Sequence, residues 1–85
     1  MAPVWCFFGG DGAAVLALRP SSESVELDGR AYCAILIPTA PIPVGGGLLY
    51  VPEEWIRPAD MGVEQLTSIY VSMGLTPPGK RNAEQ

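Results

Sequence analysis

Short apolar stretches separated by turn-forming residues make up the first part of the chain. Residues 3–8 are rich in strand-favouring side chains, and the Gly-Gly-Asp-Gly that follows them supplies the positive φ angles of a tight turn. A second apolar run covers residues 13–19 and is stopped by Pro20, which leaves too little length for a helix. We therefore predict two strands joined by a hairpin turn.

A second hairpin is indicated further along the chain. Asp28-Gly29 is a strong signal for a two-residue turn, and it separates the short strand-like segments 25–27 and 30–32. The second of these continues into the near-continuous apolar run 33–37, which Pro38 ends. Such a run is typical of a central strand that is covered on both faces.

The composition of the chain changes in its middle. Residues 38–47 hold three prolines and then three glycines, a composition that excludes both a ladder strand and a helix. Residues 48–51 predict the next strand. A short extended piece at 55–57 lies between Pro52 and Pro58, and these prolines favour a position at the edge of the sheet.

The segment 63–73 is the one convincing amphipathic helix, and Gly74 stands where a C-terminal cap glycine belongs. Pro77 and Pro78 forbid its continuation, and we expect residues 76–85 to be a disordered tail. The hairpins followed by one helix predict a single α+β domain at residues 1–75. It should have a mainly antiparallel sheet of four to six short strands, with the helix packed on one face.

Composition narrows the possible functions. The net charge is −4, and the five basic residues are scattered apart from one pair, so we do not expect nucleic-acid binding. The chain has no histidine, the side chain that most often acts as general base or zinc ligand. No apolar run reaches the roughly 18 to 20 residues that span a bilayer, so we expect a soluble chain.

No catalytic, metal-binding or cofactor-binding set is legible, and we predict that the protein is not an enzyme. Cys6 and Cys33 lack the spacing of a zinc or redox motif and are interpreted as reduced core residues. The glycines at 45–47 precede a strand rather than the helix of a phosphate-binding loop. Glu53 and Glu54 are neighbours on an extended chain, so their carboxylates should point apart.

The best candidate for a docking surface is the Pro- and Gly-rich loop 38–47 together with the edge piece near its end. Apolar side chains in a segment excluded from the sheet are hard to bury, and prolines reduce the entropy lost on binding. Two alternatives remain open: the loop folds back as a lid, and the tryptophan packs in the core. The candidate docking residues are Pro41, Ile42, Pro43, Val44 and Trp55.

The second half of the chain resembles a known family. The segments IPTAPIPVGGGLLYVPEEWI (37–56), DMGVEQL (60–66) and SMGL (72–75) are similar in order and register to the C-terminal region of DUF 502 membrane proteins. That family carries polar residues in its Pro-rich loop and at its helix start, where this chain has Ile42, Val44, Gly45 and Gly62. If those polar side chains serve a shared function, this chain has lost or altered it.

The resemblance implies an extramembrane interaction domain on the cytoplasmic side of a membrane, and it implies no enzymatic activity. Members of the family carry two N-terminal transmembrane helices, which this sequence lacks, so we expect either an excised domain or a protein with only the soluble part. A protein partner or self-association is expected. The alternative is a small-ligand-binding module that uses the loop 38–47.

Overall fold

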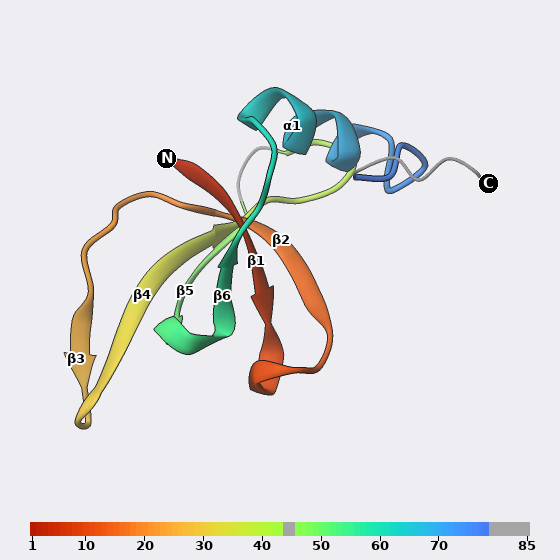
Figure 1. Cartoon of the computed structure of the whole chain (residues 1–85). Helices are drawn as coiled ribbons and strands as arrows, with labels where there is room; N and C mark the ends of the chain where they lie inside the picture. The colour runs from red at the N-terminus through yellow and green to blue at the C-terminus, as the bar shows by residue number, and fades with distance from the viewer. Residues whose placement is uncertain (44–45, 79–85) are drawn as a thin grey trace.

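The computed structural model describes residues 1–43 and 46–78, and it confirms the predicted α+β class. These residues form an antiparallel sheet with one α-helix near the C-terminus (Figure 1). Two single-turn 3₁₀ helices, η1 and η2, connect strands. The elements are β1 (Ala2–Phe7), η1 (Phe8–Gly10), β2 (Ala14–Arg19), β3 (Val25–Leu27), β4 (Arg30–Ile37), β5 (Gly47–Pro52), η2 (Glu53–Trp55), β6 (Ile56–Pro58) and α1 (Val63–Val71).

The strand register fixes the order of the sheet. Leu36 of β4 pairs with Leu18 of β2 and also with Leu48 of β5, so β2 and β5 flank β4 on opposite sides. Strand β1 pairs with β2 along its whole length and with β6 on its other side. The order is therefore β6-β1-β2-β4-β5, and β3 pairs with β4 on the β2 side. The two predicted hairpins, with their turns at residues 9–12 and 28–29, are both present.

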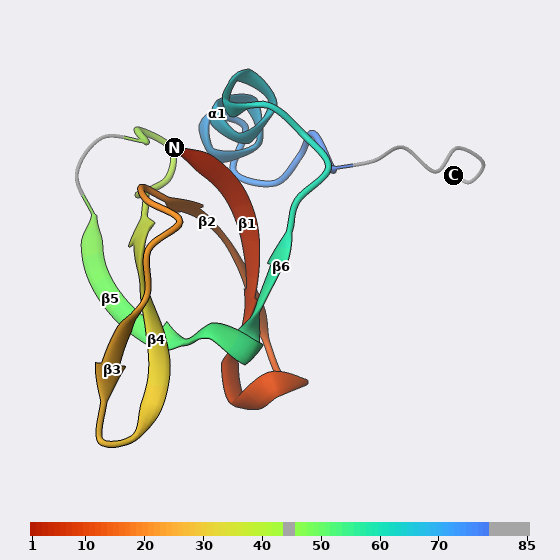
Figure 2. The same ribbon diagram turned by 60° about the vertical axis from the view of Figure 1, so that its left-hand side comes forward.

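The sheet has to curl, because its two outermost strands are close neighbours in sequence. β5 and β6 lie at opposite edges, yet only the three residues of η2 join them. A chain of that length spans at most about 14 Å from the end of one strand to the start of the next. The two edges therefore meet at η2, where β5 and β6 diverge like the arms of a V (Figure 2).

The inner face of the curl holds the main hydrophobic core. Side chains alternate between the faces of a strand, so every second residue of each strand points inward. Ile35 of β4 and Cys6 of β1 have no exposed surface, and they belong to a single cluster of six buried residues. The cluster consists of Val4, Cys6, Ala17, Cys33, Ile35 and Val51.

Helix α1 covers part of the outer face. Leu66 of the helix is buried, and so is Leu16, which points outward from β2 next to its β1 partner Trp5. Tyr70 donates a hydrogen bond from its hydroxyl to the carbonyl oxygen of Leu16, which ties the helix to the sheet. The molecule thus has a second, smaller apolar contact between α1 and the outer face of β1 and β2.

The helix ends two residues earlier than predicted. The N–H of Met73 bonds to the carbonyl of Tyr70, and the N–H of Gly74 bonds to that of Ile69. These two bonds make a Schellman cap. Met73 has a φ of 56° and Gly74 a φ of 87°, so the chain has already left the helical conformation at Met73. Gly74 was predicted at the cap position where glycine is usual, but Met73 holds that position and Gly74 is the next residue of the cap.

Two further predictions about the strands need correction. Gly47 was placed in the loop 38–47, but it is the first residue of β5 and pairs with Ile37. Trp55 was expected to start the edge strand, but it ends η2, so β6 begins at Ile56. The prediction of an edge position for this strand is confirmed.

Strand β4 was predicted to be covered on both faces, and the structure covers its outer face only in part. Cys33 and Ile35 point inward and are buried. Ala34 and Leu36 point outward and are only half-buried. The C-terminal tail was predicted at 76–85: residues 76–78 lie outside any helix or strand, and residues 79–85 lie outside the described part of the chain.

Replacement of Ile35 by Ala should destabilise the fold by about 2–5 kcal/mol, because it removes a fully enclosed side chain and leaves a cavity. The milder Ile35→Val should cost about 0.5–1.5 kcal/mol and keeps the test informative if the alanine variant fails to fold. Urea denaturation measures both. Leu75→Ala is the control, since Leu75 is 86% exposed and its truncation should change stability by less than about 0.5 kcal/mol.

Candidate binding surfaces

The predicted docking loop is exposed where the structure describes it. Ile42 has 66% of its surface exposed, Pro41 is exposed and Pro43 is half-buried. Thr39 donates a hydrogen bond from its hydroxyl to the carbonyl of Ile42, and the Ala40–Pro41 peptide bond is cis. The alternative in which the loop folds back over the sheet as a lid is therefore wrong for Ile42. Val44 lies outside the described residues.

Trp55 does not join this loop in one surface, which corrects the predicted combination. The loop precedes β5 and Trp55 follows it, so the six residues of the strand, about 17 Å at 3.3 Å per residue, separate them. The Trp55 side chain packs against the inner core, and its ring meets that of Phe8 edge to face at 5.9 Å. The core-packing alternative describes Trp55 better than the docking hypothesis.

Gly46 has a structural reason to be glycine. Its φ is 105°, and a Cβ atom at this position would lie 1.8 Å from the carbonyl oxygen of Ile37. A residue with a Cβ atom does not fit so close an approach. Gly46 therefore lets the returning chain pass against the end of β4, and the next residue, Gly47, is already part of the strand.

A groove that the sequence did not predict lies between helix α1 and the outer face of the sheet. Its volume is about 390 Å³, within the range of ligand and side-chain binding sites. The sheet, the loop after β4 and the C-terminal end of the helix all contribute to it. Its lining consists of Trp5, Leu16, Ala40, Ile69, Tyr70, Met73 and Gly74.

The groove presents an apolar surface without a charged side chain in its lining. Tyr70 supplies the one side-chain hydroxyl, and the carbonyl of Leu16 already accepts its hydrogen bond. Burial raises the pKa of Tyr70, so this hydroxyl keeps its proton at neutral pH. The groove is therefore suited to an apolar or aromatic group, which it would hold against the ring of Trp5.

Met73 occupies an unusual backbone position at the rim of this groove. It has a φ of 56° at the helix cap, a position where glycine is the usual residue. The left-handed conformation costs an L-residue roughly 1–2 kcal/mol. The Met73 side chain is nonetheless 66% exposed, so burial in the core does not offset this cost. Strained residues of this kind cluster at functional sites.

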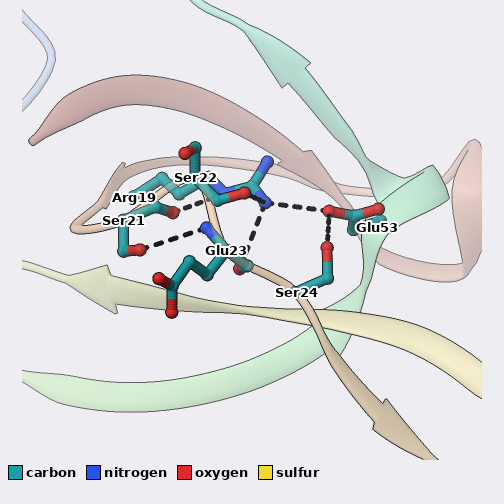
Figure 3. Close-up of polar contacts among 6 residues, drawn as sticks. All are labelled: Arg19, Ser21, Ser22, Glu23, Ser24 and Glu53. Atoms are coloured by element: carbon teal, nitrogen blue, oxygen red, sulfur yellow. Dashed lines mark hydrogen bonds and ion pairs between the residues drawn. The ribbon is translucent and has the colours of Figure 1, made fainter.

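A polar cluster holds the connection between the two sheet edges (Figure 3). The Arg19 guanidinium donates hydrogen bonds to the carbonyls of Ser21, Ser22 and Glu23, which lie in the turn after β2. Its Nη2 atom also lies 2.9 Å from a carboxylate oxygen of Glu53 in η2.

The other contacts of Glu53 and its neighbour show that this cluster is structural. Ser24 donates a hydrogen bond from its hydroxyl to the same oxygen of Glu53. The hydrogen bonds from Ser24 and Arg19 lower the pKa of Glu53. Glu54 instead pairs with Arg30 at 2.8 Å, so the two adjacent carboxylates bind different arginines. They were predicted to lie on an extended chain, but they belong to the 3₁₀ turn η2.

Both cysteines are free thiols buried in the inner core, as the sequence predicted. Burial raises the pKa of Cys6 and of Cys33, which keeps both protonated and unreactive. Among residues 1–43 and 46–78, no group of three or more metal-ligating side chains comes together. In the same part of the chain, no helix has the length and apolar character needed to cross a bilayer.

Comparisons with models of protein families, with curated proteins and with solved structures found no match for this chain. The similarity to DUF 502 proteins over residues 37–75 therefore stays a prediction.

The contacts of Glu53 predict an acid-sensitive contribution to stability. Its folded pKa lies below its ordinary value of 4.5, so ionised Glu53 stabilises the folded state above that pH. The contribution is lost as the pH falls through the folded pKa. Glu53→Gln should therefore be less stable than the wild type at pH 7, and the difference should shrink below about pH 4.

Urea denaturation at several pH values measures this effect. Glu54→Gln is the matched control, because the Glu54 carboxylate is 70% exposed and its ion pair should contribute little at any pH. A stability difference for Glu53→Gln that is the same at pH 7 and pH 3 would contradict the assigned role of this carboxylate.

Proposed function

We propose that this protein is a non-catalytic interaction domain that binds an apolar segment of a protein partner in the groove beside α1. The observation that carries the proposal is the strained and exposed Met73 at the rim of an uncharged groove with two aromatic walls. Methionine adapts its shape to different partners and is common at peptide-binding surfaces. Aromatic side chains contribute most at interaction hot spots.

A protein side chain suits this groove better than a free metabolite does. Metabolite sites usually place several polar groups around the ligand to fix its orientation. Here the one side-chain hydroxyl already has its partner, and the rim residue Met73 is open to solvent. A hydrophobic side chain needs no polar contacts in the groove, because the rest of its own chain can supply them outside it.

The loop 38–47 supports a second candidate, a small-ligand-binding module. Ala40 of this loop lines the groove, so the loop borders the same site. In this case the ligand would be an uncharged apolar molecule. If the similarity to DUF 502 proteins reflects descent, the interaction domain would act on the cytoplasmic side of a membrane, and the transmembrane helices would lie outside this sequence.

Met73→Gly separates binding from folding. Glycine relieves the left-handed strain, so the stability of the variant should equal that of the wild type or exceed it by up to about 1 kcal/mol. Removal of the side chain should weaken binding several-fold. The probe is N-acetyl-tryptophanamide, a mimic of a partner's aromatic side chain, and NMR titration should show shift changes at Trp5, Ile69 and Tyr70 in the wild type.

Two controls complete the experiment. N-acetyl-glycinamide has no side chain and should cause no shift changes at these positions. Val71→Ala alters an exposed residue on the same helix that does not line the groove, so it should bind like the wild type. Equal binding by the wild type and Met73→Gly, or shift changes elsewhere only, would refute the proposal. Tight binding of free apolar molecules without any peptide affinity would favour the second candidate.

A further inference from the structure

One arginine of the sheet has no carboxylate partner. Two of the three arginines that the structure describes pair with glutamates, at 2.9 and 2.8 Å. The third, Arg57 of β6, forms no ion pair within residues 1–43 and 46–78. Its Nη1 atom donates hydrogen bonds to the main-chain carbonyls of Glu54 and Ile56, at 3.0 and 3.2 Å. The main chain therefore holds this guanidinium in place.

The remaining donors of the Arg57 guanidinium suit a carboxylate. A guanidinium carries five N–H donors in a planar fork, and Nη1 supplies two of them to the main chain. No described residue accepts a hydrogen bond from Nε or Nη2. Two parallel N–H···O bonds from such a fork are the geometry in which arginine recognises carboxylates. Because the guanidinium is already held, binding a carboxylate should cost little further ordering of this side chain.

The strand register places Arg57 beside the groove described above. Arg57 lies directly opposite Trp5 in the β1–β6 ladder, and opposite residues of a ladder share one face of the sheet. Trp5 lines the groove, and so does Leu16, its partner on β2. These three residues form a row across three adjacent strands, which leads from the apolar groove to a positive charge.

A second hollow lies on the same face of the sheet. Phe7 follows Trp5 by two residues on β1, which is about 7 Å at 3.3 Å per residue. It lines this hollow, whose volume is about 350 Å³, together with Arg57 and the turn after β1. The lining consists of Phe7, Gly10, Asp11, Gly12 and Arg57. One short peptide can therefore reach both the apolar groove and the Arg57 guanidinium.

We infer that the partner segment carries a carboxylate two residues away from the apolar side chain that enters the groove, and that Arg57 binds this carboxylate. The inference rests on the proposed function and states the chemistry of the partner. In an extended peptide, residues two apart point to the same side and lie about 7 Å from each other. This spacing matches the separation of Trp5 and Phe7 along β1. One side chain then contacts the Trp5 ring while the other meets the guanidinium.

The other charges of the chain restrict the partner to a single carboxylate at this place. The chain has a net charge of −4, so it repels a strongly acidic segment. Asp11 lines the same hollow as Arg57, and the structure shows no ion pair between the two. Asp11 is a like charge for the bound carboxylate, so Asp11→Asn should strengthen the binding of a partner that carries one.

Two tripeptides that differ by one charge test the inference. They are acetyl-Trp-Ala-Glu-amide and acetyl-Trp-Ala-Gln-amide, and each is also made in the reversed order. In NMR titrations of the wild type, the Glu peptide should bind about two- to five-fold more tightly than the Gln peptide in at least one order, as expected for an exposed ion pair. Both should shift the signals of Trp5, but only the Glu peptide should shift the Nε–H signal of Arg57.

Two variants show whether the preference comes from Arg57. Arg57→Gln should bind the two peptides equally, and it should fold, because Arg57 is exposed. Arg30→Gln is the matched control, since it changes the net charge by the same amount. Arg30 pairs with Glu54 and lines neither the groove nor the second hollow, so this variant should keep the preference.

The possible failures of the inference and of the proposed function are distinct. Equal affinity of the wild type for the Glu and Gln peptides in both orders would overturn the inference and leave the proposed function intact. A preference that survives in Arg57→Gln, or that Arg30→Gln abolishes as well, would also overturn it. If neither the tripeptides nor N-acetyl-tryptophanamide shifts the signals of the groove, the proposed function fails and this inference fails with it.

Discussion

The three-residue connection Glu53–Trp55 is the constraint on which the rest of the structure depends. It joins strands β5 and β6, which lie at opposite edges of the sheet. A flat sheet of five strands is about 19 Å wide at 4.8 Å per strand, more than this connection can span. The sheet must therefore curl, and the curl encloses Ile35 and the other five residues of the inner core cluster. Arg19 and Ser24 hold the connection in place through Glu53.

The same curl explains why binding surfaces lie on the outside of the sheet. The inner face holds the buried core cluster, and the groove lies on the outer face. One short helix cannot cover an outer face of this size. It covers part of β1 and β2 and forms the groove with Trp5 at its border. The proposed binding groove follows from this incomplete cover.

Local sequence patterns predicted the elements well, because each depends on neighbouring residues. The Asp28-Gly29 turn is an example, and the end of the helix was predicted to within two residues. The site was harder to predict. Trp55 is close to the loop in sequence, but β5 carries it to the other end of the curl. The groove combines Trp5 with residues more than sixty positions away, and only the packing of α1 brings them together. The apolar run 33–37 was predicted to be covered on both faces, whereas its outward residues Ala34 and Leu36 are only half-buried.

Long-range NMR contacts across the inside of the curl test the central claim most directly. Strands β5 and β6 share no ladder, so in an open sheet their inward side chains would be far apart. In the curled sheet Val51 and Leu49 belong to the same packed core as Val4 and Ile56. Methyl-methyl nuclear Overhauser effects should therefore link the first pair of residues to the second. Effects from Val51 and Leu49 to β4 residues alone would show an open sheet and contradict the account.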